Sequence, residues 1–571
     1  MSWSVRVRAS AAAILGVVVA AVLVQPAVAE PDMVSVIVRS EQSTGHAAAA
    51  VRDAGGDVEL TLEVIDGVAA ELPVDRVADL RAADLTVTPD ERIQPLADSR
   101  VDTTQPVTVR TVVEVTGAED YWASGATGAG VGVALIDTGV APVQGLDAGQ
   151  VRHGPDLSFE ANAPELRHLD TYGHGTHMAG LIVGRDADAH PTRPDADGFL
   201  GMAPDAHLIS LKVADAHGVT DVSQVIAAID WVVTHHDDPD LNIRVLNLSY
   251  GTYSRQRYTT DPLSHAAEAA WDAGIVVVAA AGNDGDTVKG LTTPAIDPRI
   301  LAVGAVDTND SSLDWRWRPL SFSARGDGSR NPDLLAPGAS VSSLRVPGSQ
   351  LDLLYGDTAT VDERFFKGSG TSQSAAIVSG AAALVVGANP RWTPDMVKAA
   401  LLANGDRLGR EFTPETGQLA LRLDTMAGAT PPNRIPTHRP SAGGGDLDAT
   451  RGDAVLVTAD GVELTGNRDL FGQPLDTAAL AKGLANGGTW VDGVWNGNQW
   501  TGHGWDGLRW MGQAWTGTDW AGHQWSGHQW SGHQWSGHQW SGGEWAGHQW
   551  SGHQWSGHQW SNATWSSASW R

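Results

Sequence analysis

Residues 131–139 read Val-Gly-Val-Ala-Leu-Ile-Asp-Thr-Gly, and this stretch decides the fold. Apolar and small side chains run without interruption from Val131 to Ile136, and Asp137 follows directly. A strand that helices cover on both faces of a parallel sheet has this pattern, because neither of its faces meets water. The stretch therefore predicts a buried central strand with a carboxylate at its carboxyl end.

Similar apolar runs recur at residues 208–213, 243–248, 275–281 and 300–306. Helix-like stretches alternate with them; residues 222–234, for example, place their apolar side chains on one stripe. Residues 374–386 are small and apolar all round, which is typical of a buried central helix. The alternation predicts a doubly wound, parallel α/β sheet, in which functional side chains stand at the carboxyl ends of strands.

The composition excludes several classes of protein. The chain has 571 residues and a formal net charge of −29, which argues against a nucleic-acid partner because phosphate contacts need a basic surface. It has no cysteine, so disulfides, thiolate catalysis and cysteine-ligated metal clusters are excluded. At the start, Arg6 and Arg8 precede an apolar run over 9–24, and Ala-Val-Ala at 27–29 is a signal-peptidase pattern. We therefore expect a signal peptide over residues 1–29 and a secreted protein.

Four polar side chains stand beside the predicted strands and helices. Asp137 ends the first strand, and His174 lies in Gly-His-Gly-Thr-His, where glycines allow a sharp turn into a helix. Asn283 follows another strand, and Ser372, in Gly-Thr-Ser, begins the apolar helix. A carboxylate can hold the tautomer of a histidine that takes a hydroxyl proton. A helix N-terminus and a side-chain amide can hold a developing oxyanion.

These four side chains, in this order along the chain, resemble the subtilisin-type serine peptidases. Further stretches typical of that family are Gly-Met-Ala-Pro-Asp-Ala at 201–206, Leu-Asn-Leu-Ser-Tyr-Gly at 246–251, Phe-Ser-Ala-Arg-Gly at 322–326 and Leu-Ala-Pro-Gly at 335–338. The resemblance covers about residues 111–455. It implies a subtilisin-like fold and a serine endopeptidase that hydrolyses peptide bonds of proteins or peptides through an acyl-enzyme.

The resemblance also implies residue roles. It assigns a catalytic triad to Asp137, His174 and Ser372, and an oxyanion-hole donor to Asn283. The substrate-binding strand, whose backbone pairs with an extended peptide, ends in Ser249, Tyr250 and Gly251. No cofactor is required, and although calcium stabilises many family members, no compact calcium loop is readable in this sequence.

One feature departs from the family's usual sequence after the serine, and a second offers a competing interpretation of the histidines. The family usually has Met-Ala after the serine and a proline four residues beyond it, whereas Gln373, Ser374 and Ala376 stand here. Because alanine favours helix more than proline does, we expect the helix to persist, with consequences for specificity and rate. His174 and His177 could instead form a metal pair, but no acidic third ligand follows at a metalloprotease spacing, so no metal site is expected.

A separate unit precedes the catalytic domain. Residues 30–110 show a β-α-β-β-α-β order, which resembles the ferredoxin-like, α+β inhibitory propeptides of the same family; an unrelated small domain is the alternative. Residues 91–114 are polar and contain proline, as a processing linker would. We therefore expect the chain's own propeptide to inhibit it until self-cleavage.

The C-terminal part is a pentapeptide repeat. From Trp490 to Trp570 a tryptophan recurs at every fifth residue, mostly with a glycine two places on, after a connecting segment at 456–489. Neither a helix nor a flat strand puts this period on one stripe. A solenoid, an aromatic array that binds cell-wall glycan, and a disordered tail remain open for residues 490–571. Eight histidines in the repeat are interpreted as polar filler rather than metal ligands; they are His503, His523, His528, His533, His538, His548, His553 and His558.

Two classes of function follow from these observations. The first is a secreted, self-processing serine endopeptidase with an appended tail that associates with the cell wall. The second is a cell-wall or matrix binding protein whose peptidase domain only matures the precursor or is inactive. The complete set of Asp137, His174, Asn283 and Ser372 favours the first.

Overall fold

The computed structural model describes residues 33–499 except for 41, 63–66, 83–84, 90–105, 147–148, 162, 164, 192–197, 286, 309–316, 427, 431–437, 453–463 and 471, and beyond them residues 508–510, 513–515, 544–549 and 559–564. The predicted signal peptide, the processing linker up to residue 105 and most of the predicted tail lie outside the described residues. The chain divides into two compact units near residue 90.

The N-terminal unit is a four-stranded sheet with two helices. Its sheet order is β2-β3-β1-β4, and β1 runs antiparallel to both of its neighbours. Val38, Val51, Val68 and Leu72 form its small core. The elements are β1 (Met33–Arg39), α1 (Thr44–Asp53), β2 (Asp57–Leu62), β3 (Gly67–Pro73), η2 (Val74–Arg76), α2 (Val77–Ala82) and β4 (Thr86–Pro89).

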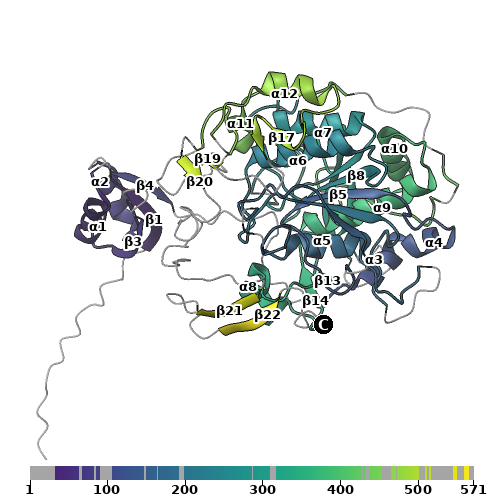
Figure 1. Cartoon of the computed structure of the whole chain (residues 1–571), viewed down its shortest axis with the longest axis horizontal. Coiled ribbons are helices and arrows are strands. Elements are labelled where there is room, and N and C mark those ends of the chain that lie inside the picture. The colour runs from purple at the N-terminus through teal and green to yellow at the C-terminus, as the bar shows by residue number, and fades with distance from the viewer. Residues whose placement is uncertain are drawn as a thin grey trace, which may run out of the picture. The chain divides into compact units, whose positions relative to one another are not determined.

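The second unit is built on one large sheet (Figure 1). The neighbours from β6 through β7, β5, β8, β9, β10 and β12 to β16 all pair in parallel, whereas β11 and β15 add antiparallel edges. The prediction of a parallel α/β sheet is therefore confirmed. Its strands are β5 (Gly132–Asp137), β6 (Val151–His153), β7 (His207–Lys212), β8 (Ile243–Leu248), β9 (Val276–Ala280), β10 (Leu301–Asp307), β11 (Arg318–Pro319), β12 (Leu334–Pro337), β15 (Asp406–Arg407) and β16 (Leu419–Ala420).

Helices cover both faces of this sheet. On one face α5 packs against α9, and on the other α6 packs against α7 (Figure 1). By length and composition α9 could cross a membrane, but 89% of it is buried inside this unit, as in the core helix that its sequence predicts. The helices are α3 (Val109–Thr116), α4 (Ala118–Ala123), α5 (His174–Val183), α6 (Val222–His235), α7 (Pro262–Asp272), α8 (Gln350–Ala359), α9 (Thr371–Ala388) and α10 (Pro394–Asn404).

The start of this unit lies earlier than the predicted boundary at residue 110. Val107 forms a backbone bridge with Val341, and its N–H donates to the Ser340 carbonyl at 2.8 Å. Thr108 caps α3, whose residues Val112 and Val113 are buried in the main core. A boundary at 110 would cut through this packed helix. The second unit therefore includes residues from Val107 onward.

The end of this unit lies later than predicted. Trp490 and Trp495, the first two tryptophans of the repeat, are buried against α6: the Trp490 indole donates to the Ala227 carbonyl at 2.8 Å and the Trp495 indole to an Asp230 carboxylate oxygen at 2.8 Å. The predicted boundaries at 455 and 490 are therefore wrong, because the segment that carries these two tryptophans packs on the second unit. Elements of this C-terminal part are α11 (Leu447–Arg451), α12 (Thr477–Leu484), β17 (Val494–Trp495), β18 (Asn498–Gln499), β19 (Leu508–Trp510), β20 (Gln513–Trp515), β21 (Glu544–Gln549) and β22 (Gln559–Thr564).

Replacing Trp495 should destabilise the second unit. Trp495→Ala removes a buried aromatic ring and a hydrogen bond to the buried Asp230, so we expect the free energy of unfolding to fall by about 3–5 kcal/mol. Val491→Ala, at an exposed position in the same segment, should change it by less than about 0.5 kcal/mol. Urea unfolding measures both. Equal stability of the two variants would mean that the segment does not brace α6.

Candidate active site

The carboxyl ends of β5 and β8 lie side by side, because Ile136 pairs with Leu248 in the parallel register. Asp137 is the last residue of β5, and His174 is the first residue of α5. The His174 Nδ1 lies 2.7 Å from the Asp137 Oδ1, and both side chains are almost fully buried. Gly173 makes the sharp turn into α5 with a φ of 105°, which glycine adopts without strain. The Asp–His pair predicted from the sequence is therefore in contact.

Burial and charge act in opposite directions on His174. Burial lowers the pKa of His174, but the charge and hydrogen bond of Asp137 and the charge of Asp170 raise it, and the net shift is above the usual value of 6.5. Asp137 thus stabilises the imidazolium form. Within the described residues, the His174 Nε2 has no hydrogen-bond partner, so this nitrogen remains available to exchange a proton.

Ser372 stands in the first turn of α9, at the same end of the sheet. Its hydroxyl lies 3.5 Å from the carbonyl oxygen of Ser249, the residue after β8. The next residue, Tyr250, has its ring centroid 6.5 Å from that of His174. One short segment thus lies against both Ser372 and His174. The structure gathers these predicted side chains around the ends of β5 and β8.

Hydrogen bonds from Thr371 to the side-chain oxygen orient Asn283. Its Oδ1 accepts hydrogen bonds from the Thr371 N–H at 2.9 Å and the Thr371 hydroxyl at 3.0 Å. The Asn283 Nδ2 is buried and, among the described residues, finds no acceptor. The backbone N–H of Ser372 also belongs to a first helical turn, where N–H groups lack an intrahelical acceptor. The Asn283 amide, held against Thr371, and the N–H of Ser372 are donors of the kind that can hold a negatively charged oxygen.

The predicted substrate-binding residues follow β8. The Ser249 hydroxyl accepts from the Asn247 side-chain amide at 2.9 Å. Gly251 lies so close to Thr292 that an added Cβ would stand 2.6 Å from the Thr292 hydroxyl oxygen, so this turn has no room for a side chain. Burial raises the pKa of the Tyr250 phenol well above its usual value, and the phenol therefore stays neutral.

The departures after the serine do not break the helix. α9 runs from Thr371 to Ala388 with Ala376 inside it, as we expected for alanine in place of proline. The Ser374 hydroxyl donates to the Ala336 carbonyl at 3.0 Å and so ties α9 to β12. Gln373 is buried with its amide against Gly368, and in the part of the chain that the structure describes its Oε1 has no partner. An amide therefore stands next to Ser372.

His177 is not placed as a metal ligand. Its Nε2 donates to the Phe366 carbonyl at 3.0 Å, and burial together with the charge of His174 lowers the pKa of His177 to about 4. No three His, Asp or Glu side chains among the described residues are grouped to hold a metal ion. The tail histidines interpreted as filler lie largely outside those residues.

Sequence reasoning missed Asp170. One of its oxygens accepts from the Thr138 hydroxyl and from the Gly173 N–H, each at 2.7 Å, and the other accepts from the Thr176 N–H at 2.7 Å. Asp170 thus fastens the end of β5 to the start of α5. Its position four residues before His174 was the available signal, but a lone aspartate in a loop did not distinguish it.

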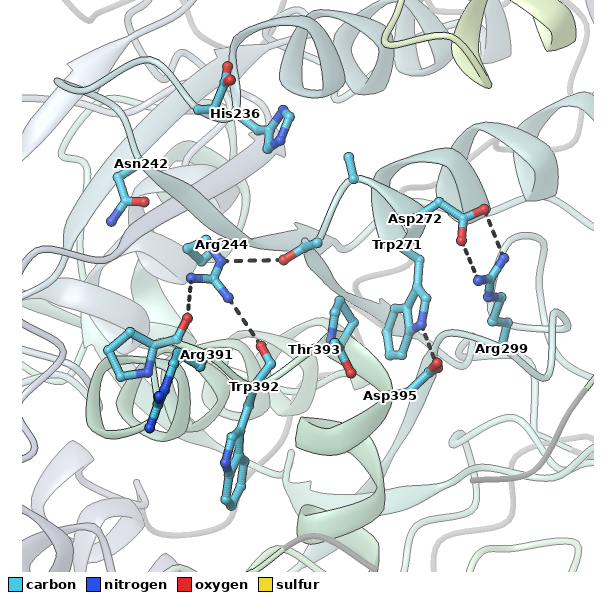
Figure 2. A pocket seen from close by; sticks show the side chains of 15 residues that line it. His236, Asn242, Arg244, Trp271, Asp272, Arg299, Arg391, Trp392, Thr393 and Asp395 are labelled. Carbon is cyan, nitrogen blue, oxygen red and sulfur yellow. Dashed lines mark hydrogen bonds and ion pairs between the residues drawn. The ribbon is translucent and has the colours of Figure 1, made fainter. Parts of the chain in front are cut away.

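A hollow of about 550 Å³ lies at the opposite, amino ends of the strands (Figure 2). Two pairs of its polar groups bind each other: the Arg299 guanidinium with Asp272, and the Trp271 indole with Asp395 at 2.8 Å. Arg244 donates to the Pro390 carbonyl at 3.2 Å. These contacts tie α7, α10 and β8 together, and the hollow contains none of the predicted site residues.

The comparisons agree with this geometry. Residues 128–420, just over half of the chain, match the model of the Subtilase family (Peptidase_S8). The chain is 37% identical over 287 residues to Serine protease AprX of Bacillus subtilis (strain 168), covering 49% of this chain and 62% of AprX. It is 33% identical over 285 residues to Subtilisin Savinase of Lederbergia lenta, covering 50% of this chain and 87% of that protein.

A solved structure also matches, the crystal structure of a cold adapted subtilisin-like serine proteinase. The identity is 27%, the TM-score is 0.38, and the match covers 52% of this chain and 89% of the other. On the match to the family model and the identity to Subtilisin Savinase, the chain belongs to the subtilase family of serine peptidases. The resemblance seen in the sequence is confirmed.

Removing the charge of Asp137 should lower the pKa of His174. In the native protein we expect a value above 6.5, because Asp137 outweighs burial; in Asp137→Asn burial prevails and the pKa should fall below 6.5. Titration of the ¹⁵N-labelled imidazole by NMR measures both values. Asp272→Asn, which removes a distant exposed carboxylate, is the control and should leave the pKa of His174 unchanged. An unaltered pKa in Asp137→Asn would contradict this electrostatic account.

Proposed function

We propose that this protein is a secreted serine endopeptidase that cleaves peptide bonds through an acyl-enzyme. The observation that carries the proposal is the buried 2.7 Å contact between Asp137 and His174, which leaves the His174 Nε2 without a hydrogen-bond partner among the described residues. A nucleophile, a base and a group that orients the base are the parts that such catalysis needs. The alternative is a cell-wall or matrix binding protein whose peptidase domain only matures the precursor or is inactive; the contact between Asp137 and His174 disfavours an inactive domain.

In the first step His174 acts as general base. It takes the hydroxyl proton of Ser372 as the oxygen attacks the peptide carbonyl, and Asp137 holds the imidazole in the tautomer whose Nε2 can accept that proton. The raised pKa of His174 fits this task, because the imidazolium that forms beside Asp137 is stabilised.

The tetrahedral intermediate places a negative charge on the former carbonyl oxygen. In this proposal the Asn283 Nδ2 and the Ser372 N–H donate to it, and one such donor typically contributes about 3 kcal/mol to the stabilisation of the transition state. Because Thr371 already fixes the Asn283 amide, little reorganisation is needed as the charge develops. His174 then protonates the leaving amine, and water repeats the sequence on the acyl-enzyme.

The substrates proposed are proteins or peptides in extended form. The backbone of Ser249 to Gly251 continues from β8 past Ser372, where an extended peptide can pair with it. AprX and Subtilisin Savinase bear names that describe peptidases, which supports this substrate class. No cofactor enters the proposed steps.

The N-terminal unit is proposed as an inhibitory propeptide that is cut off after secretion. Its four-stranded sheet has the element order expected of such propeptides, and it forms a compact unit separate from the rest of the chain. Because Val107 and α3 belong to the catalytic core, the cut should fall before Val107, between about residues 97 and 106.

The tryptophans of the repeat beyond residue 499 are proposed to bind cell-wall glycan. Flat indole faces stack on sugar rings, and a glycine two places on leaves one face uncrowded. Trp490 and Trp495 have no part in this proposal because α6 already buries them. A deletion that tests wall binding should therefore begin at residue 500.

Replacing Ser372 tests the nucleophile and the processing together. Ser372→Ala should lose all labelling by a fluorophosphonate probe and all cleavage of unfolded casein, and it should retain the N-terminal unit uncut. The secreted wild type should begin between residues 97 and 106 by N-terminal sequencing. Ser374→Ala, which removes a neighbouring buried hydroxyl on α9, is the matched control and should still label. Labelling that persists in Ser372→Ala refutes the assignment.

Replacing Asn283 tests the oxyanion donor. Asn283→Ala should lower kcat by about 10²–10³ with little change in KM. Asn283→Asp keeps the acceptor for Thr371 but lacks the N–H donor, so its kcat should fall at least as far. If Asn283→Asp instead restores the native kcat, the amide acts only by holding Thr371.

A further inference from the structure

Helix α8 has the surroundings of a binding surface rather than of a core element. It lies in the connection between β13 (Val341–Leu344) and β14 (Phe365–Gly368), and β14 leads directly to Ser372 (Figure 1). All of its residues are described, and each is half-buried or exposed. A helix without a buried side chain contributes little to a core, so another role has to account for it.

The start of α8 is fastened to the loop that carries His174. The Gln350 N–H donates to the Thr171 carbonyl at 3.0 Å, and the Leu351 N–H donates to the Tyr172 carbonyl at 2.9 Å. Asp352 accepts from the Arg345 guanidinium at 2.6 Å, which holds the first turn from the other side. The position of α8 is therefore fixed relative to His174.

Apolar side chains are concentrated on this helix. Among the described residues, the exposed large apolar side chains are Val74, Leu353, Leu354, Val361 and Val491, and three of these five lie in or just after α8. The Leu351 Cβ lies 3.6 Å from the position that a Cβ on Gly173 would take. Leu354 and Tyr355 share the face of Leu351, because residues three and four apart are neighbours on a helix. Leu354, 51% exposed, thus extends an apolar face outward from the His174 loop.

The proposed reaction decides which part of a substrate passes this face. His174 hands its proton to the leaving amine, so the leaving half of the peptide departs from the side of His174. α8 lies against the three residues that precede His174. The chain just beyond the cleaved bond is therefore the part of a bound substrate that α8 can touch.

We propose that Leu351, Leu354 and Tyr355 form an apolar subsite for the leaving half of the peptide, within its first three residues after the cleaved bond. This inference rests on the proposed peptidase function. It assigns α8 to substrate selection: an apolar side chain in the leaving half is held against the helix, whereas a polar one gains nothing there. The acyl half of the substrate does not depend on this contact.

Two substrate series with one common acyl half separate these effects. Internally quenched peptides carry either leucine or serine at the first three positions of the leaving half, and a p-nitroanilide of the same acyl half has no leaving peptide. For the wild type we expect kcat/KM to be about 10-fold or more higher for the leucine peptides. Leu354→Ser should reduce this ratio at least several-fold and leave nitroanilide cleavage unchanged.

Leu353→Ser is the matched control. It makes the same chemical change on the same helix. Because Leu353 lies two residues after Leu351, its side chain points away from the face that Leu351 and Leu354 share. Its ratio of kcat/KM for the leucine peptides over the serine peptides should equal that of the wild type.

A wild-type ratio near one, or an equal loss of the ratio in both variants, overturns the proposal. A Leu354→Ser enzyme that keeps its ratio but binds the separated propeptide more weakly also overturns it, because α8 would then be a propeptide contact. Absence of both nitroanilide cleavage and probe labelling in the wild type would refute the peptidase function itself, and the subsite with it.

Discussion

The carboxylate of Asp170 is fully buried and joins the two segments on which the active site depends. It accepts from Thr138, next to Asp137, and from Gly173 and Thr176 on either side of His174. A buried carboxylate is tolerated only when its oxygens are hydrogen-bonded, and here three donors meet that demand. The same bonds fix the distance between the end of β5 and the start of α5. The 2.7 Å contact of His174 with Asp137 follows from that distance.

Buried polar pairs also hold α6, which covers the face of the sheet opposite to α5 and α9. Arg451 pairs with Asp221, the residue that caps α6, at 2.8 Å, and both side chains are about 1% exposed. Further along α6, Asp230 accepts from Thr489 and from the Trp495 indole. Removing one partner of such a buried pair leaves an unsatisfied charge, which costs more than the pair itself contributes. The C-terminal segment is therefore integral to α6 and does not merely rest on it.

Sequence reasoning reached the parts of this protein that depend on local pattern. The apolar run before Asp137 predicts a buried strand, and the small side chains after Ser372 predict a buried helix; both are present. It failed where the outcome depends on tertiary partners. In sequence Trp490 and Trp495 look like the later tryptophans of the repeat, and their burial depends on partners in α6 that lie far away along the chain. The polar appearance of residues 91–114 likewise hid the valines of α3, whose burial requires the rest of the core.

The burial of Trp490 and Trp495 has a mechanical consequence. A pull on the chain beyond residue 499 would first reach Asn498, which donates to Asp469 at 3.1 Å, and then the two indoles with their bonds to α6. α6 covers the face of the sheet opposite to α5 and α9, which carry His174 and Ser372. Tension applied to the chain beyond residue 499 would therefore act first on elements that carry neither His174 nor Ser372.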